Sequence, residues 1–198
     1  MRITDAILLA AGSSNRMGSP KQMLPIGETP LLIRTTRIIR SCPNIRNVFV
    51  ILGANSDLLE SALANEPVQT IISDHWQNGM GASLKSGLAA IKRTNPPPEQ
   101  IIITVCDQPH LNIEILNQLI TSGQQDKISA SDYGNEIGTP ALFDFNFFDE
   151  LNSIPDDSGA RRLFSIHKDK LIRVPFPAGS IDLDTPEDYE KFLKSEKS

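Results

Sequence analysis

The sequence predicts an α/β protein in which a mostly parallel sheet lies between two layers of helices, a three-layer α/β/α sandwich. Four aliphatic runs without polar alternation are typical of strands buried on both faces of such a sheet; they are 6–9, 48–52, 68–72 and 101–105. Stretches of helical periodicity separate them, and strands joined through helices form a parallel sheet with right-handed crossovers. In this fold class, ligands bind at the carboxyl ends of the strands.

Four helices are expected between and after these strands, at 30–39, 57–63, 82–93 and 113–120. Pro30 is placed at the first position of its helix, where the missing N–H of a proline needs no partner. Arg34, Arg37 and Arg40 recur every three residues. This spacing predicts that they form the solvent face of that helix.

The second half of the chain is less regular. Strands are expected near 128–130, 141–143 and 171–175, and helices near 147, over 159–166 and over 186–193. Thr185, Pro186 and Asp188 have the residue types of a capped helix N-terminus. Residues 95–98 are interpreted as a surface loop and 194–198 as a frayed tail. Since no linker or repeat divides the sequence, residues 1–198 are interpreted as a single domain.

Charge and cysteine content exclude several classes of function. The 198 residues contain 19 Lys and Arg against 24 Asp and Glu, a net charge of −5, which disfavours nucleic acid or an anionic membrane as partner. Cys42 and Cys106 form no metal-binding or redox motif and are expected to be free thiols in a reducing cytoplasm. The apolar run at 6–11 is too short to span a membrane.

The first predicted strand leads into a loop of small residues followed by two cations. Ala10, Ala11, Gly12 and Ser13 would let backbone N–H groups approach an anion, and Arg16 with Lys21 adds positive charge. The loop matches neither the dinucleotide-binding fingerprint nor the Walker A motif, and it lacks the second glycine of a serine nucleophile elbow. We therefore interpret 10–21 as a cradle for a triphosphate, the alternative being an ordinary turn.

Acidic residues follow two other predicted strands. Asp107 comes directly after the apolar run 101–106, and Asp182 and Asp184 precede the terminal helix. Mg²⁺ needs only one or two protein carboxylates when waters and substrate phosphates complete its shell. Asp107 is thus the candidate metal ligand, with Asp182 or Asp184 as its partner. His75, His110 and His167 lack the spacing of a zinc site.

Three further motifs carry weaker signals. Gly79, Gly81 and Ser83 precede or open a helix whose N-terminus could contact a base or phosphate, with Ser83 as a helix cap the simpler interpretation. Gly138 and Pro140 flank Thr139 in what could be a plain turn. Gly159 and Arg161 begin a segment whose guanidinium groups could bind an acceptor phosphate or lie in solvent.

Six segments, in this order, are similar to the MobA-like NTP transferase group: LAAGSSNRMGSPK, GMGASLKSGL, CDQP, GTP, DDSGARRLF and DLDTPEDY. The resemblance covers 7–193 and implies a Rossmann-like nucleotidyltransferase fold, with a nucleotide-binding half at about 1–110 and an acceptor-binding half at about 111–193. LAAG, GMGASL and GAR resemble the molybdenum-cofactor cytidylyltransferases more than the guanylyltransferases. Asp156 and Asp157 replace the Gly-Asp that is usual before the GAR segment.

The resemblance implies a role for each motif. Gly12, Arg16 and Lys21 would hold the triphosphate, Asp107 and Asp182 would bind Mg²⁺, and the base would lie against Ala10, Ala11 and 79–83. Acceptor contacts would come from four further residues, Gly138, Pro140, Gly159 and Arg161.

The implied reaction is Mg²⁺-dependent transfer of CMP from CTP to the terminal phosphate of molybdopterin, with pyrophosphate released. A molybdoenzyme or its chaperone would be a further partner. Two alternatives remain open: use of GTP or of a sugar- or alditol-phosphate acceptor, and a nucleotide-binding or cofactor-handover protein without turnover.

Overall fold

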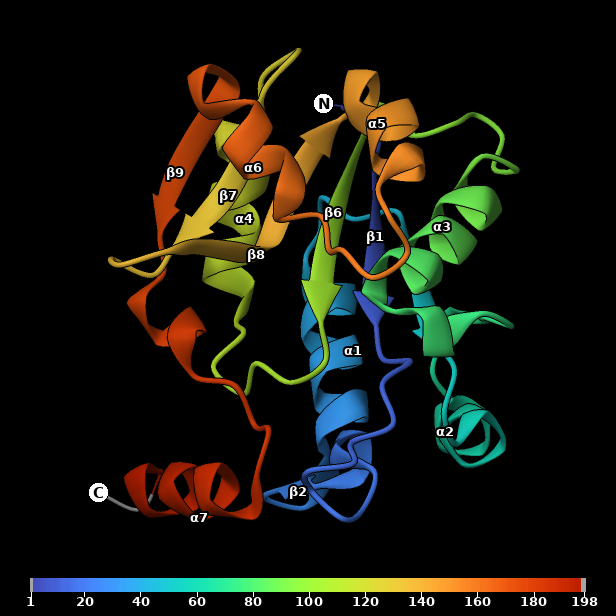
Figure 1. Cartoon of the computed structure of the whole chain (residues 1–198), viewed down its shortest axis with the longest axis vertical. Coiled ribbons are helices and arrows are strands. Elements are labelled where there is room, and N and C mark those ends of the chain that lie inside the picture. Colours follow the sequence, from blue (N-terminus) through green and yellow to red (C-terminus); the bar gives the residue numbers. More distant parts are fainter. Residues whose placement is uncertain (1, 197–198) are drawn as a thin grey trace.

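The computed structural model describes residues 2–196, and one seven-stranded sheet runs through it (Figure 1). The strand order is β5-β4-β1-β6-β8-β7-β9. β8 is antiparallel to its neighbours β6 and β7, and the other neighbouring pairs are parallel. The strands are β1 (Thr4–Leu9), β4 (Asn47–Leu52), β5 (Gln69–Ile72), β6 (Gln100–Val105), β7 (Ile128–Asp132), β8 (Ile137–Asp144) and β9 (Leu171–Pro175). This arrangement confirms the predicted mostly parallel sheet.

Helices pack on both faces of the sheet because strand residues alternate between two apolar cores. In β1, Ala6 and Leu8 belong to one core, and Ile7 and Leu9 belong to the other. Residues of α1, α2, α4 and α7 complete the first core, and residues of α3, α5 and α6 complete the second. The helices are α1 (Leu31–Ser41), α2 (Ser56–Leu63), α3 (Met80–Ile91), α4 (Ile113–Ser122), α5 (Phe148–Ser153), α6 (Arg162–Ile166) and α7 (Pro186–Ser195). The predicted three-layer sandwich is therefore confirmed.

Several predicted boundaries differ from the structure. Pro30 is not at the first position of α1: it ends the short strand β3 (Thr29–Pro30), which pairs with β2 (Pro25–Ile26), and it is the N-cap of α1. α6 is shorter than predicted, since it begins at Arg162 rather than at residue 159. α7 continues through Ser195, so the predicted tail is helical at its start, and residues 197–198 of that tail lie outside the described part.

Two smaller expectations agree with the structure. Thr185 and Asp188 form a capping box at the start of α7, with Pro186 in its first turn. Cys42 and Cys106 are free and buried.

Within residues 2–196, no helix is both long and apolar enough to cross a membrane.

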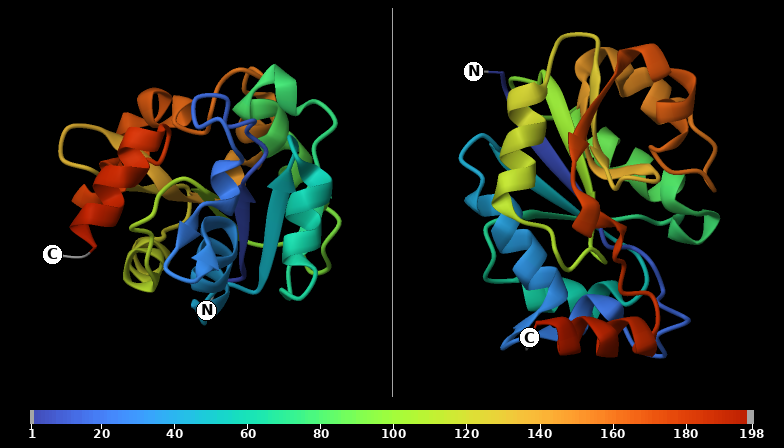
Figure 2. Two further views of the ribbon diagram at one scale, coloured as in Figure 1. Left: turned by 90° about the horizontal axis from the view of Figure 1, so that it is seen from below. Right: turned by 90° about the vertical axis from the view of Figure 1, so that its left-hand side faces the viewer.

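The carboxyl ends of the parallel strands all lie at one edge of the sheet. Leu9 at the end of β1 is level with Ile51 and Val105, so the chain segments leaving β1 and β6 start side by side. α7 lies beyond this edge, at the same end of the molecule as the loop that follows β1 (Figures 1 and 2). The fold thus brings the glycine-rich loop, the segment after β6 and the segment before α7 together.

Candidate active site

Lys21 joins two carboxylates at the carboxyl edge of the sheet. It begins the short 3-10 helix η1 (Lys21–Met23). Its Nζ donates to Asp107 Oδ2 at 2.6 Å and to Asp184 Oδ1 at 2.9 Å. Burial lowers the pKa of Lys21, but these two carboxylates outweigh it, so the net pKa is raised and the ammonium group stays charged. An ammonium has three donors, so one remains available to a further anion.

Arg16 extends this cation group toward solvent. Its guanidinium donates to Asp184 Oδ2 at 2.8 Å, while 71% of its side chain is exposed. Partial burial raises the pKa of Asp184, but the hydrogen bonds and charges of Lys21 and Arg16 outweigh it and hold the pKa below its usual range. Asp184 is therefore already paired with two cations, Arg16 and Lys21, of the segment that follows β1.

Asp182 differs from Asp184 although the two are separated by one residue. Among the described residues, its carboxylate accepts no hydrogen bond and forms no ion pair. Partial desolvation, together with the carboxylates of Asp107 and Asp184, raises the pKa of Asp182 to about 6, although the residue retains access to solvent. The Asp182 carboxylate is thus available to a cation, and the charges of Lys21 and Arg161 only partly offset the effects that raise its pKa.

The backbone fixes how these carboxylates lie relative to one another. Leu183 is fully buried, and its N–H donates to the carbonyl oxygen of Asp107 at 2.9 Å. The buried anchor at Leu183 therefore holds Asp182 and Asp184 beside the end of β6. This contact joins segments that lie far apart in the sequence, and no local pattern predicts it.

A cavity of about 370 Å³ opens next to Lys21 and Asp107. Its walls come from the end of β1 and the loop after it, from the end of β6 and the residues that follow, and from the segment around η2 (Trp76–Asn78). Eight of the predicted site residues line it: Ala10, Ala11, Gly12, Ser13, Lys21, Gly79, Ser83 and Asp107. The size matches the lower end of small-ligand pockets.

The cavity is also lined by Gln22, Trp76 and Gln77, which are not among the predicted site residues. Gln22 is 1% exposed and its Nε2 donates to the carbonyl oxygens of Ala10 and Gly12, both at 2.9 Å. It therefore fixes the shape of the β1 loop from inside. Its position directly after Lys21 was the one feature of the sequence that could have indicated a role for Gln22. A buried amide in a loop follows no hydrophobic periodicity, so no sequence pattern predicts it.

The start of α3 is already occupied by the protein's own backbone. The N–H groups of Gly81 and Ala82 donate to the carbonyl oxygen of Asp156 at 2.8 and 3.3 Å, and a Cβ on Gly81 would lie 2.3 Å from the carbonyl oxygen of Pro155. Two N–H groups of this helix N-terminus are therefore already bonded within the protein, and contact of the segment with a base or phosphate stays a prediction. Ser83 is the fourth residue of α3 and lines the cavity, so it is not the helix cap; Gly79 is the N-cap.

The four predicted acceptor residues lie around the hairpin between β7 and β8. Gly138 and Pro140 belong to β8 and are buried, whereas Arg161 is half-exposed. Arg161 donates to Glu136 Oε2 at 2.7 Å and to the carbonyl oxygen of Ile137 at 3.1 Å, which joins 159–161 to this hairpin. A Cβ on Gly159 would lie 3.0 Å from Met80 Sδ, so Gly159 packs beside the start of α3.

Arg34 does more than the predicted solvent contact. Its guanidinium donates to the carbonyl oxygen of Pro109 at 2.5 Å and so ties α1 to the turn that carries Asp107. Arg37, which is mostly exposed, pairs with the largely covered carboxylate of Glu66. The three-residue spacing correctly placed these arginines on one face, but it could not show that the turn after β6 packs there.

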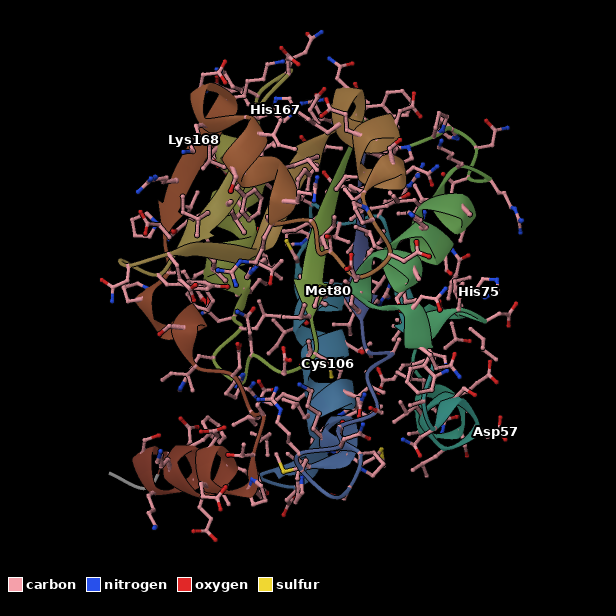
Figure 3. All side chains as sticks on the ribbon, viewed as in Figure 1. Asp57, His75, Met80, Cys106, His167 and Lys168 are labelled. Carbon is pink, nitrogen blue, oxygen red and sulfur yellow. The ribbon has the colours of Figure 1, made fainter. Side chains whose placement is uncertain are left out.

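Within residues 2–196, the His and Cys side chains lie apart from one another. Met80 and Cys106 lie toward the carboxyl edge, His75 lies to one side, and His167 is at the opposite end of the molecule (Figure 3). Burial holds the pKa of the Cys106 thiol far above its usual range, so the thiol is neutral. Across residues 2–196, no three His, Cys, Asp or Glu side chains converge in a way that could hold a metal ion.

Comparison with known proteins identifies the family. A family model described as the MobA-like NTP transferase domain matches residues 6–171. The molybdenum cofactor cytidylyltransferase of Escherichia coli strain K12 is 25% identical over 96% of this chain and 95% of that protein. The nicotine blue oxidoreductase of Paenarthrobacter nicotinovorans is 29% identical over 78% of each chain.

A solved structure agrees with the sequence matches. The crystal structure of Rv0371C from Mycobacterium tuberculosis H37Rv in complex with manganese superimposes with a TM-score of 0.80, at 26% identity, over 98% of this chain and 100% of that one. The shared sheet, the matched residues and the loop of small residues beside a cation and carboxylates lead to one assignment. The chain belongs to the MobA-like NTP transferase family and is a nucleotidyltransferase of that family.

Proposed function

We propose that this nucleotidyltransferase transfers CMP from CTP to the terminal phosphate of a molybdopterin-type pterin and releases pyrophosphate. The observation that carries the proposal is the cavity between the β1 loop and α3, because it opens beside Lys21 and Asp107. Its lining includes two of the three motifs that resemble the cytidylyl branch, LAAG through Ala10 with Ala11 and GMGASL through Gly79 with Ser83. The cytidylyltransferase among the relatives supports the same choice.

The proposed transfer is an in-line displacement at phosphorus. An oxygen of the acceptor phosphate forms a bond to the α-phosphorus of CTP, the bond from that phosphorus to the oxygen bridging to the β-phosphate breaks, and pyrophosphate leaves with the electron pair. A phosphate monoester is already largely ionised near neutral pH, so no general base is required. The protein's task is to align two anions and to stabilise their charge.

Lys21 and Arg16 supply the positive charge for this task. Lys21 lies at the cavity and remains protonated because Asp107 and Asp184 raise its pKa. Arg16 reaches the same carboxylate group from the exposed part of the loop. In our proposal Lys21 contacts the phosphates nearest the reacting centre, and Arg16 contacts the outer phosphates.

The residues present fit a divalent cation such as Mg²⁺. Asp107 offers a hard carboxylate oxygen at the cavity, and Asp182, in the segment that the Leu183 N–H ties to the Asp107 carbonyl oxygen, offers a second one. Desolvation, followed by the charges of Asp107 and Asp184, raises the pKa of Asp182, and a bound cation would offset both effects. Asp184 is the weaker candidate for the second ligand, because Arg16 and Lys21 already bind its two oxygens. Bound Mg²⁺ would neutralise charge on the triphosphate and on the departing pyrophosphate.

The acceptor would bind on the β8 side of these carboxylates. Gly138 and Pro140 in β8, with Gly159 and Arg161 beside the hairpin, are the residues that we assign to it. In this proposal the nucleotide-binding half at about 1–110 and the acceptor-binding half at about 111–193 meet along the pair β6 and β8. A molybdoenzyme or its chaperone would then receive the product.

A thermal-shift panel tests the nucleotide assignment. CTP, GTP, ATP and UTP would each be added with and without Mg²⁺, and a ligand that binds only the folded state raises the melting temperature. We expect the largest shift with CTP and Mg²⁺. A larger shift with GTP would transfer the assignment to the guanylyl branch.

Pyrophosphate release tests the reaction itself. With CTP, Mg²⁺ and molybdopterin we expect stoichiometric pyrophosphate, and we expect none when the acceptor is omitted. Release only with a sugar phosphate or alditol phosphate would change the acceptor class. Nucleotide binding without release for any acceptor would identify a non-catalytic nucleotide-binding or handover protein.

A further inference from the structure

The hydroxyl of Tyr133 lies at the junction of the acceptor elements and the carboxylate segments. It donates to the carbonyl oxygen of Thr139, between Gly138 and Pro140, and it accepts from Gln108 Nε2 at 2.7 Å. Gln108 is 3% exposed and follows Asp107 directly. Desolvation raises the pKa of Tyr133, so the hydroxyl stays protonated and keeps its donor role. One hydroxyl group therefore links β8 to the turn that carries Asp107.

Gln108 extends this link to the segment before α7. Its Nε2 also donates to the carbonyl oxygen of Gly179 at 2.7 Å. Gly179 lies three residues before Asp182, and the N–H of Leu183 returns to the carbonyl oxygen of Asp107. The two bonds from residues 107 and 108 therefore hold the segment from 179 to 183 at both ends.

Close packing around the Tyr133 ring leaves little freedom at this junction. A Cβ on Gly138 would lie 2.3 Å from the Tyr133 hydroxyl oxygen, and a Cβ on Gly179 would lie 2.5 Å from Tyr133 Cε1 and 2.4 Å from Phe176 Cδ1. Such distances exclude any side chain at either glycine without movement of the ring. The Tyr133 ring therefore packs closely against both β8 and the segment 179–183.

We propose that Tyr133 and Gln108 are positioning residues, which hold the acceptor elements of β8 in fixed register with Asp107 and Asp182. This inference rests on the proposed function. In the proposed transfer, the acceptor phosphate must approach in line with the α-phosphorus held at those carboxylates, so the position of β8 relative to Asp107 and Asp182 affects the rate. Small misplacement of reacting groups costs large factors in rate. Neither residue contacts the nucleotide cavity, so both act through the acceptor side.

Tyr133→Phe is the test, and Tyr189→Phe is its matched control. The chain has two tyrosines, and the Tyr189 hydroxyl also donates to a backbone carbonyl, that of Pro25, at 2.6 Å, away from the acceptor elements. We expect Tyr133→Phe to lower kcat/KM for molybdopterin at least tenfold and to leave the Kd of CTP within twofold. The single tryptophan, Trp76, lines the cavity, so we would follow CTP binding by its fluorescence. Tyr189→Phe should leave both values within twofold of wild type.

Hydrogen exchange separates this inference from the proposed reaction. In Tyr133→Phe, and not in Tyr189→Phe, peptides covering 137–142 and 181–184 should exchange faster, because the Thr139 and Gln108 bonds are lost. Two results for Tyr133→Phe would overturn the inference if the wild-type enzyme is active. One is an unchanged kcat/KM for molybdopterin, and the other is a loss of CTP affinity as large as the loss of kcat/KM for molybdopterin. If the wild-type protein releases no pyrophosphate, the proposed function fails, and the exchange rates alone decide whether Tyr133 couples the two segments: unchanged exchange would refute the coupling.

Discussion

At the amino ends of the parallel strands, Asp5 is fully buried and all its hydrogen bonds come from one neighbouring segment. Arg46 donates to both of its oxygens, at 2.9 and 2.6 Å, and the backbone and side chain of Asn47 donate to Oδ1. At the carboxyl ends, 23% of the Asp107 side chain is exposed, and its partner Lys21 is shared with Asp184. Both edges pair an aspartate with a cation, but only the first pair is closed to ligands.

The difference separates a structural ion pair from a functional one. A buried carboxylate with a full set of donors keeps its partners, because losing any one of them leaves a charge without compensation. A cation shared between two partly exposed carboxylates has alternatives, and its neighbours include Asp182, whose pKa is raised to about 6. Groups with such perturbed charge states beside a cavity are candidates for function.

Breaking the amino-edge pair should give the largest effect on stability. Arg46→Leu leaves the Asp5 carboxylate buried without its cation, and we expect a loss of about 3–5 kcal/mol in the free energy of unfolding. Urea denaturation at neutral pH measures this loss. The pyrophosphate release of the folded fraction should stay within about twofold of wild type, since the pair lies at the opposite edge of the sheet from the cavity.

The control for this change is Lys92→Leu, which removes an exposed pair with Asp149. Exposed pairs contribute about 0–1 kcal/mol, so this variant should unfold almost as wild type does. Equal losses of unfolding free energy for Lys92→Leu and Arg46→Leu would show that burial of Asp5 does not set the stability of the amino edge.

Breaking the carboxyl-edge pair should give the largest effect on activity. Asp107→Asn keeps the side-chain shape and removes the charge, and we expect pyrophosphate release to fall by about 10²–10³, roughly 3–4 kcal/mol of transition-state stabilisation. The melting temperature should change by no more than about 2 °C, because Asp107 is partly exposed. Raised Mg²⁺ should restore part of the activity, since Asp182 and the phosphates still offer oxygen ligands.

A titration of activity against Mg²⁺ checks this expectation. If Asp107→Asn retains wild-type turnover with an unmoved Mg²⁺ dependence, Asp107 is only a turn residue. The metal site would then have to be sought at Asp182 and Asp184.

Removing the cations at this edge should also slow turnover without unfolding the protein. For Lys21→Ala and Arg16→Ala we expect losses of about 2–4 kcal/mol in transition-state stabilisation, with Lys21→Ala the larger because Arg16 is mostly exposed. Steady-state kinetics and thermal denaturation measure the two quantities. Lys92→Ala, which removes an exposed pair with Asp149, is the control. Turnover within a few-fold of wild type for Lys21→Ala would contradict the triphosphate cradle.

The sequence predicted the strands better than the contacts between their loops. The strand containing 101–105 lies within one residue of its predicted bounds, because a run buried on both faces admits few alternatives. Pro30 was misplaced because a proline suits both a helix start and a strand end, and pairing with β2 decided between them. The predicted length of α6 was too great, because tertiary contacts of Arg161 tie the residues before Arg162 to the hairpin between β7 and β8.

The site was partly predictable for a similar reason. Residues in the β1 loop and Asp107 follow strands directly, so the fold class itself places them at one edge. Gln22, Tyr133 and Gln108 were missed because their importance comes from partners that are distant in the sequence. The choice between Asp182 and Asp184 as the second metal ligand depends on the ion pairs that Arg16 and Lys21 form with Asp184. These pairs cannot be predicted from sequence spacing.

The smallest expected effect concerns the helix cap beside the carboxyl edge, and it shows whether that edge also contains a purely structural carboxylate. Asp188 accepts from the Thr185 hydroxyl at 2.8 Å and from its N–H at 3.0 Å, and these bonds hold the pKa of Asp188 below its usual range. A carboxyl whose pKa is lowered on folding stabilises the protein above its ordinary pKa of about 4, and this contribution is lost as the pH falls through the folded-state value. Asp188→Asn should therefore lower the melting temperature by about 1–2 °C at pH 7, and the difference from wild type should shrink steadily below about pH 4.

Melting curves of both proteins between pH 2.5 and pH 7 measure this trend. Asp149→Asn is the control, because Asp149 lies in the first turn of α5 without a capping box, so its difference from wild type should vary less with pH. Kinetics at pH 7 complete the comparison: Asp188→Asn should keep kcat and the Mg²⁺ dependence within about twofold, since the capping carboxylate faces Thr185 and not the cation group. A loss of Mg²⁺ affinity in this variant would mean that the helix cap positions Asp182 and Asp184, and that structure and function are not separable at this edge as they are at the amino edge.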